Sequence, residues 1–245
     1  MVNNIVIDHA DIVTSHMCNN HCKFCVDKFI HTSSDKVSME HIGKFLQLLR
    51  MHTNERLEVL LLGGEPTMLE TEELINIAKL IHSYGFSPIM STNGIDKEKI
   101  RSVLPYYDWV QVTVYRDSDI DYWRDEPHKI NIKLSGDSAL DIHKLRHFIA
   151  YTEGFERRSV SMYFTPDFEQ LCKDEDIWNL LDFEITNWQR NGSYIYGFYE
   201  GVRFKKCIPG ETNIIDEPTV PKLYPNGTYN KTWCNEEMDA YLGEL

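Results

Sequence analysis

Three cysteines stand close together near the start of the chain, in HMCNNHCKFC (16–25). Cys18, Cys22 and Cys25 are spaced C-x3-C-x2-C, with no fourth cysteine nearby. A disulfide needs two thiols and a closed zinc site needs four ligands, so His16 or His21 would have to complete a zinc site. A [4Fe–4S] cluster held by three cysteines would instead leave one iron open to an outside ligand. Because thiolates suit both metals, the spacing alone leaves zinc and iron–sulfur open.

The composition is that of an acidic globular protein. The chain has 25 lysines and arginines against 38 aspartates and glutamates, which gives a net charge of −13. This balance argues against a broad phosphate-binding face, so we do not expect nucleic acid as a partner. No apolar run reaches the roughly 18 residues that span a membrane, and the N-terminal segment lacks the regions of a signal peptide. We therefore expect a cytoplasmic protein, not a membrane protein, whose reduced thiols are metal ligands rather than disulfides.

The cysteines must be positioned by regular elements, and the hydrophobic pattern predicts alternating strands and helices. The predicted strands, several of them near-continuous apolar runs, are 5–15, 57–64, 86–94, 109–115, 129–136 and 159–165. The predicted helices are 38–52 with Ser38 as its cap, 71–85 with Thr71 as its cap, 97–105, 138–154 and 174–192. Six strand–helix units in series indicate an α/β fold whose parallel sheet curls into a partial (β/α)6 TIM-like barrel.

Two regions are predicted along the chain. Residues 1–192 form the barrel, and residues 193–245 form a small β-rich extension that packs on it. The stretch 193–207 alternates aromatic and small residues, which is typical of a hairpin with turns at its glycines. The charged stretch 116–126 follows the fourth strand, so we expect a solvated loop there.

Two further motifs follow predicted strands. GGEP (Gly63 to Pro66) comes after the second strand and STNG (Ser91 to Gly94) after the third, while the cysteines come after the first. In barrels of this kind the active face lies at the C-terminal ends of the strands, where all three motifs fall. Together and in this order, the motifs resemble those of the radical S-adenosylmethionine (radical SAM) enzyme superfamily, and the resemblance covers roughly residues 5–165.

The resemblance implies an enzyme of the oxidoreductase or lyase type, with a [4Fe–4S] cluster and SAM as cofactors. Cys18, Cys22 and Cys25 would hold the cluster, and SAM would chelate its open iron. Reductive cleavage of SAM would give a 5′-deoxyadenosyl radical that abstracts hydrogen from a substrate. The residues that the resemblance places around SAM are Phe24 near the adenine, Gly63, Gly64, Glu65 and Pro66 near the amino group, and Ser91, Thr92 and Asn93 near the ribose or carboxylate. Further candidates for the SAM carboxylate or the substrate are Thr113, Tyr115 and Arg116, then Lys133 and Ser135, with packing or a solvated loop as the alternative.

The substrate is less constrained by the sequence. A peptide side chain is favoured because residues 207–234 resemble a shortened form of the auxiliary-cluster extension of peptide-modifying radical SAM enzymes. A second cluster usually needs four thiolates, so free thiols are the competing interpretation of Cys172, Cys207 and Cys234. The same motifs are compatible with a small metabolite or nucleotide as the substrate, or with activation of a glycyl-radical partner. Outside enzymes, a zinc-stabilised binding module is the alternative. The implied partners are the substrate and a reductase such as flavodoxin or ferredoxin.

Overall fold

The computed structural model describes residues 9–22, 25, 35–135, 141–162, 186–191, 194–207 and 220–229. Phe24, Cys172 and Cys234 lie outside these residues, as does the first part of the helix predicted at 174–192. The chain divides into two compact units. One comprises Met1–Asn20, Asp27–Trp109 and Ile215–Leu245, and the other comprises His21–Val26 and Val110–Ile214.

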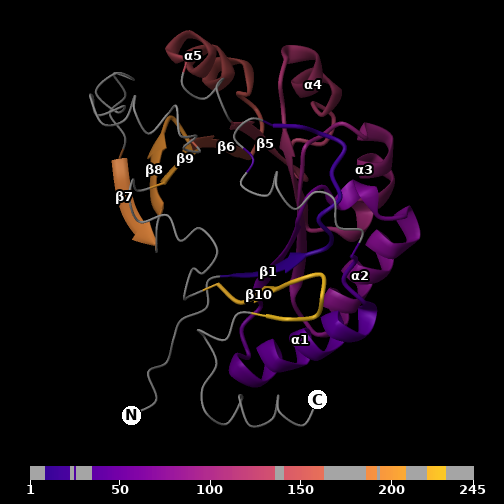
Figure 1. Cartoon of the computed structure of the whole chain (residues 1–245). Coiled ribbons are helices and arrows are strands. Elements are labelled where there is room, and N and C mark those ends of the chain that lie inside the picture. The colour runs from indigo at the N-terminus through magenta and orange to yellow at the C-terminus, as the bar shows by residue number, and fades with distance from the viewer. Residues whose placement is uncertain are drawn as a thin grey trace. The chain divides into compact units, whose positions relative to one another are not determined.

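The first unit is a parallel sheet flanked by helices, as predicted (Figure 1). Its strands run in the order β10–β1–β2–β3, and each pair in this order is parallel. The elements in chain order are β1 (His9–Val13), α1 (Met39–His52), β2 (Glu58–Leu62), η1 (Pro66–Met68), α2 (Thr71–Ser83), β3 (Ser87–Thr92), α3 (Lys97–Val103), η2 (Leu104–Tyr106) and β10 (Lys222–Leu223). Strands β1, β2 and β3 are each followed by a helix, which is the usual connection between parallel neighbours.

The helix caps of this unit agree with the sequence in one case and differ in another. Ser38 caps α1 as predicted, because its side-chain oxygen accepts a hydrogen bond from the His41 N–H at 3.1 Å. The predicted cap Thr71 is instead the first residue of α2, and Glu70 is the N-cap. The Glu70 N–H donates to the Glu73 carboxylate at 2.8 Å. The acidic residue three positions after the N-cap therefore fixes the start of this helix.

A short strand from late in the sequence covers the outer edge of β1. Strand β10 lies parallel to β1, and the Asp11 N–H donates to the Pro221 carbonyl at 2.7 Å. The Lys222 ammonium lies 3.3 Å from the buried Asp11 carboxylate. The edge of β1 is therefore held by backbone pairing and by an ion pair.

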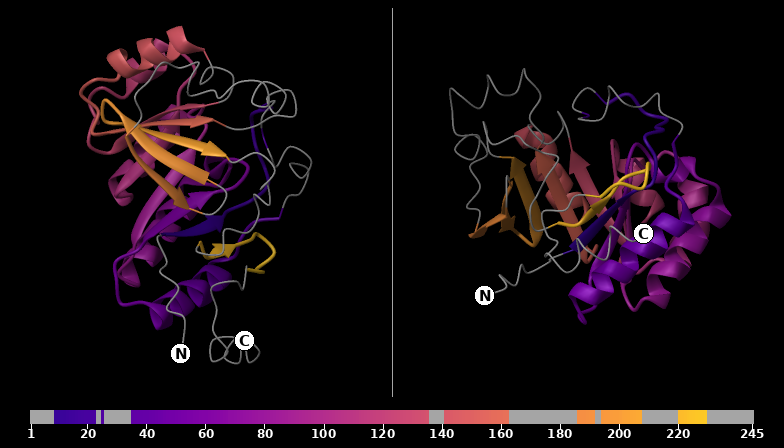
Figure 2. Two further views of the ribbon diagram at one scale, coloured as in Figure 1. Left: turned by 90° about the vertical axis from the view of Figure 1, so that its left-hand side faces the viewer. Right: turned by 60° about the horizontal axis from the view of Figure 1, so that its bottom comes forward.

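The second unit continues the strand–helix alternation and then changes to antiparallel strands. Its order is β4–β5–β6–β9–β8–β7, in which β4 to β9 are parallel neighbours and β9, β8 and β7 are antiparallel. The elements are β4 (Trp109–Thr113), α4 (Asp117–Tyr122), β5 (Ile130–Ser135), α5 (Ile142–Tyr151), β6 (Arg157–Met162), β7 (Thr186–Asn191), β8 (Tyr194–Tyr199) and β9 (Val202–Cys207). Figure 2 shows strands β7, β8 and β9, in orange, beside one another. The predicted hairpin at 193–207 is confirmed as β8 and β9, and β9 joins the parallel strands beside β6.

The helix predicted at 174–192 is wrong at its C-terminal end. Residues Thr186–Asn191 form strand β7, which pairs with β8 and contains a register shift between Thr186 and Gln189. The physical reason is visible in the sequence, since Gly192-Ser193 between the two strands has the glycine-first pattern that favours two-residue hairpin connections. Pairing of Asn191 with Tyr194 then fixes the register of the two strands.

The solvated loop predicted at 116–126 is also corrected, because Asp117–Tyr122 forms the short helix α4. Ile120 and Trp123 are spaced three apart and both are buried, so the segment has an apolar face despite its charge. The Asp119 carboxylate, in the first turn, accepts a hydrogen bond from the Tyr115 N–H at 3.2 Å. This contact supplies a partner for a backbone donor at the helix start.

Candidate functional site

The loops that follow β1, β2 and β3 meet at one edge of the first unit. Val13 is in register with Leu62, and the Thr14 N–H donates to the Leu62 carbonyl at 2.8 Å. The chain therefore leaves β1 for the cysteine motif directly beside the point where β2 ends and GGEP begins. Parallel strands bring their C-terminal ends to the same edge, so the three predicted motifs of this unit are neighbours.

The two glycines of GGEP let the cysteine loop pass close to the backbone. A Cβ on Gly63, whose φ is +141°, would lie 2.4 Å from the Ser15 carbonyl oxygen, and one on Gly64 would lie 2.2 Å from that of Met17. The Gly64 N–H donates to the Ser15 carbonyl at 2.9 Å, and the Glu65 N–H donates to the Met17 carbonyl at 2.7 Å. These glycines are thus required by the protein's own first loop, independently of any contact with SAM.

Alanine at Gly64 is expected to displace the cysteine loop, because the added Cβ would meet backbone atoms that have no freedom to rotate away. We expect a loss of about 3 kcal/mol in the free energy of unfolding, measured by urea denaturation. Gly43→Ala is the matched control, since Gly43 lies within α1 and its added Cβ would meet nothing within 4 Å. That variant should gain about 0.5–1 kcal/mol through helix propensity. Equal stability of the two variants would contradict the close approach.

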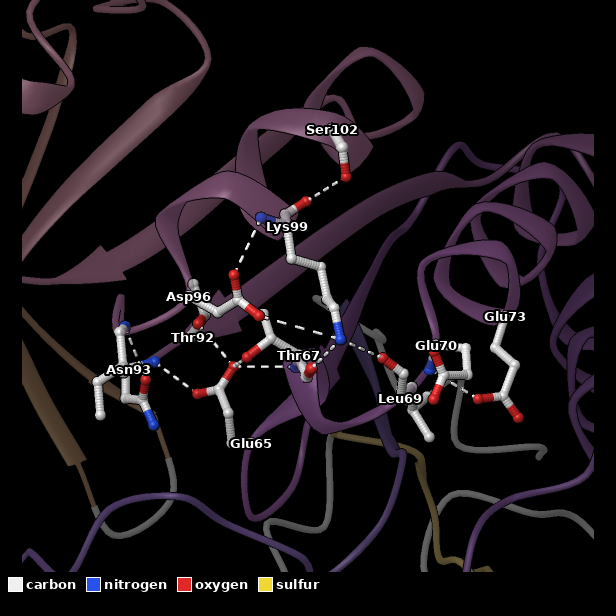
Figure 3. Close-up of polar contacts among 11 residues, drawn as sticks. Glu65, Thr67, Leu69, Glu70, Glu73, Thr92, Asn93, Asp96, Lys99 and Ser102 are labelled. Atoms are coloured by element: carbon white, nitrogen blue, oxygen red, sulfur yellow. Dashed lines mark hydrogen bonds and ion pairs between the residues drawn. The ribbon is translucent and has the colours of Figure 1, made fainter.

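The carboxylate of Glu65 joins the loops that follow β2 and β3 (Figure 3). One oxygen accepts from the Thr67 N–H at 3.0 Å, the Thr67 hydroxyl at 2.7 Å and the Thr92 hydroxyl at 2.7 Å. The other accepts from the Asn93 N–H at 2.7 Å. Glu65 is only 1% exposed, so this network of four donors offsets the desolvation of a buried charge.

Lys99 of α3 binds the backbone of the turn that follows GGEP (Figure 3). Its ammonium donates to the carbonyls of Thr67 at 2.9 Å and Leu69 at 3.0 Å, at the end of η1. Asp96, the N-cap of α3, lies 4.0 Å from the same ammonium. The sequence analysis did not single out Thr67 or Lys99. The position of Thr67 directly after GGEP could have indicated its role, whereas no sequence pattern indicates the role of Lys99.

Asn93 connects the third loop to the cysteine loop. Its side-chain amide donates to the Asn19 side-chain oxygen at 2.7 Å and lies 4.0 Å from the Cys18 sulfur. The Asn20 N–H also points at this sulfur, at 3.4 Å. Burial raises the pKa of the Cys18 thiol, and the Glu65 carboxylate acts in the same direction, while the N–H groups of Asn20 and Asn93 act in the opposite one. Cys18 therefore lies in a polar setting in which N–H donors face its sulfur.

The other two cysteines belong to the second unit. The Cys25 N–H donates to the Cys22 carbonyl at 3.1 Å, which makes a tight turn between them. All three cysteines are half-buried and not in disulfides. Among the residues that the structure describes, no three His, Cys, Asp or Glu side chains are grouped so as to hold a metal ion. The assignment of the cluster ligands therefore rests on the spacing and stays a prediction.

The remaining candidates fall into two sets. Thr113, Lys133 and Ser135 lie on strands β4 and β5, with Thr113 in register with Lys133, and the last two are buried. Tyr115 and Arg116 lie instead at the exposed start of α4, where the Arg116 guanidinium is 3.4 Å from Asp119. Pro66 is buried at the start of η1, and Ser91 is half-buried in β3. Contact of any of these residues with SAM stays a prediction.

Comparison with known protein families identifies the chain. A family model described as the radical SAM superfamily matches residues 12–135, which is just over half of the sequence. This chain belongs to the radical SAM superfamily. Membership brings SAM and a [4Fe–4S] cluster as the cofactors of this protein and confirms the resemblance of its three motifs. No curated protein matches the sequence.

Solved structures of radical SAM proteins resemble the chain in fold. The anSMEcpe structure with bound AdoMet and Cp18Cys peptide is 16% identical over 64% of this chain, with a TM-score of 0.52. The one with AdoMet and Kp18Cys peptide is 15% identical over 64% of it, with a TM-score of 0.53. BtrN in complex with AdoMet and 2-DOIA is 12% identical, covers 98% of this chain and 87% of its own, and has a TM-score of 0.47. The matched region spans about half of the anSMEcpe chain, 51% and 52% in the two structures.

The likeness to anSMEcpe confirms the predicted fold class, an α/β partial TIM-like barrel. None of the described helices is both long and apolar enough to cross a membrane.

The residues present fit the family's cofactors by their chemistry. Three thiols outside disulfides supply the donor type that iron–sulfur clusters take. N–H groups directed at a cysteine sulfur, as at Cys18, are among the features that set the potential of such clusters. The buried hydroxyl of Ser15 and the ring Nδ1 of His16, both without a partner in the described residues, lie at the entry to this loop.

Proposed function

We propose that this radical SAM protein cleaves SAM at a [4Fe–4S] cluster and uses the resulting radical to modify a peptide side chain. Cys18, Cys22 and Cys25 would hold the cluster, with one iron left for SAM. When bound, these cofactors supply a 5′-deoxyadenosyl radical that abstracts hydrogen from the substrate. The oxidoreductase or lyase outcome and the use of flavodoxin or ferredoxin as reductant belong to the same proposal.

The observation that carries the proposal is the Glu65 network. It binds the GGEP turn to Thr92 and Asn93 of STNG, and Asn93 in turn reaches the loop of Cys18. Hydrogen bonds thereby connect the loops of three motifs that are far apart in the sequence.

The chain's own groups have defined tasks in this proposal. Backbone donors and acceptors of GGEP and STNG orient SAM, and the buried Glu65 keeps those loops in place. The barrel excludes water and stray hydrogen donors from the radical. Residues 1–192 would form this barrel, and residues 193–245 would shape its substrate side.

A peptide substrate is supported by two features. The C-terminal segment 207–234 resembles a shortened auxiliary-cluster extension, and the anSMEcpe structures that share the fold hold peptides. Because the likeness covers about half of those chains, the substrate is a proposal for this protein.

The test is anaerobic reconstitution with iron and sulfide, followed by SAM and dithionite. We expect iron uptake of about four per chain and formation of 5′-deoxyadenosine. Stoichiometric zinc with no iron uptake and no cleavage would overturn the proposal. Mass analysis of peptides incubated with the active enzyme then tests the substrate class.

A further inference from the structure

The STNG loop continues into helix α3 through local hydrogen bonds. The Ile95 N–H donates to the Asn93 side-chain oxygen at 3.0 Å. Asp96 then caps α3, because its carboxylate accepts a hydrogen bond from the Lys99 N–H at 3.1 Å. Such turns restrict the backbone between the loop and the helix, so we expect a displacement of α3 to displace STNG with it.

Helix α3 places one lysine beside its buried side. Ile100 and Val103 are three residues apart and completely buried. The side chain of the neighbouring Lys99 is only 22% exposed, and its ammonium lies 4.0 Å from the Asp96 carboxylate. Lysine ammonium groups ordinarily stay in water, so the partners of this one are informative.

The partners of Lys99 are backbone carbonyls at the end of η1, the short helix that begins at Pro66 of GGEP (Figure 3). A helix leaves the carbonyls of its last turn without partners inside it. The Lys99 ammonium donates to the Thr67 carbonyl at 2.9 Å and to the Leu69 carbonyl at 3.0 Å. Thr67 and Leu69 are at most 3% exposed, so their carbonyls need partners within the protein.

Thr67 is the residue at which two links between the GGEP and STNG loops meet. Its N–H and hydroxyl donate to the Glu65 carboxylate at 3.0 and 2.7 Å, and its carbonyl accepts from Lys99. Glu65 reaches Thr92 and Asn93 directly, whereas Lys99 reaches the STNG loop through α3. The two links also differ in chemistry, because a carboxylate only accepts hydrogen bonds and an ammonium only donates them. Loss of one link therefore leaves the other in place.

We propose that Lys99 is a positioning residue for SAM, which holds the GGEP turn at the spacing from the STNG loop that SAM binding requires. It acts from helix α3 through the carbonyls of Thr67 and Leu69, and not by contact with SAM. The cysteine loop is held separately, by the N–H groups of Gly64 and Glu65, so loss of Lys99 should leave the cluster in place. This inference rests on the proposed function, because that function assigns both loops to SAM.

The test is calorimetric titration of SAM into reconstituted protein without a reductant. Lys99→Met keeps a long apolar side chain and removes the donors, so SAM binding should become about tenfold weaker. Lys99→Arg has donors for both carbonyls and should restore most of the affinity. Lys44→Met is the matched control, because it removes the same charge and breaks an ion pair with Glu40, at 2.8 Å, that stays within α1. The iron content should stay at about four per chain in all three variants.

Kinetics with SAM as the varied reactant separate positioning from stability. In Lys99→Met, the KM for SAM should rise about tenfold and kcat should change less than about twofold, because a contact that serves binding alone leaves kcat unchanged. A purely structural role would lower the free energy of unfolding, measured with urea, and leave the SAM affinity and KM unchanged. If Lys99→Met does not fold, Lys99→Gln takes its place. Its shorter, neutral side chain should also weaken SAM binding, and an unchanged affinity would have the same meaning.

Three results would overturn the inference: Lys99→Met binds SAM as tightly as the natural protein, Lys44→Met weakens binding as much as Lys99→Met, or Lys99→Met loses its iron. Loss of iron would mean that Lys99 supports the cysteine loop and not the SAM loops. The same preparations are assayed for 5′-deoxyadenosine. Cleavage by the natural protein with unchanged SAM affinity in Lys99→Met sinks only this inference. Weaker SAM binding by Lys99→Met with no cleavage by the natural protein sinks only the proposed function.

Discussion

Alanine at Cys18, Cys22 or Cys25 is expected to reduce the iron content of reconstituted protein from about four per chain to near none. Each thiolate supplies one of three protein ligands, and two remaining thiolates are expected to be too few to hold the cluster. Formation of 5′-deoxyadenosine should disappear with the iron. The measurements are iron and sulfide content, the charge-transfer absorbance of the cluster, and chromatography of the nucleoside. Retained SAM cleavage in any one of the three variants would remove that cysteine from the cluster.

The matched control is the double variant Cys207→Ala and Cys234→Ala, which also removes thiols but lies outside the motif. It should keep about four irons per chain. A fall from about eight to about four would instead reveal a second cluster held by the C-terminal segment. Circular dichroism of each apoprotein shows whether a loss of iron is caused by unfolding.

Glu65→Gln is expected to be nearly as damaging, although it changes one atom and keeps the shape of the side chain. All four partners of this carboxylate are donors, namely the Thr67 N–H and hydroxyl, the Thr92 hydroxyl and the Asn93 N–H. A glutamine would turn its NH2 group toward one of these donors in either orientation. We expect a loss of about 2–4 kcal/mol in the free energy of unfolding and SAM binding about tenfold weaker.

Glu72→Gln is the control for the change of charge, because Glu72 is exposed on α2. Its stability should stay within about 0.5 kcal/mol of the natural protein. Urea denaturation gives both free energies, and calorimetric titration of SAM gives the affinities. If Glu65→Gln behaves like Glu72→Gln, the carboxylate does not hold the loops, and the network loses its proposed role.

Strand positions were predictable because short apolar runs bounded by turn residues indicate strands, whether nearly every residue is buried, as in β3, or alternate residues are, as in β2 and β4. Strands β2, β3 and β4 lie inside the predicted ranges, and Ser38 begins α1 as expected. Strand β7 was missed because the apolar pattern upstream of it is helical, and the Gly192-Ser193 hairpin signal was not given weight. Helix α4 was missed because its charges dominate a six-residue segment, whereas Ile120 and Trp123 set its packing.

The sequence motifs of the site were predictable, but the hydrogen bonds that join their loops were not. The order of the cysteines, GGEP and STNG after successive strands located the loops. No local pattern indicates that Lys99 bonds to the carbonyls of Thr67 and Leu69, because that contact exists only once α3 has packed beside η1.

The pairing of β10 with β1 has a consequence for the protein as it is being made. Strand β1 is synthesised early, whereas residues 220–229 follow nearly all the rest of the described chain. Until they emerge from the ribosome, the outer edge of β1 has unpaired backbone groups, and unpaired edges are templates for aggregation. The Asp11–Lys222 ion pair and the Pro221 carbonyl can close that edge only after residue 222 has been synthesised. A nascent chain stalled before residue 220 would therefore expose the strand that leads into the cysteine loop.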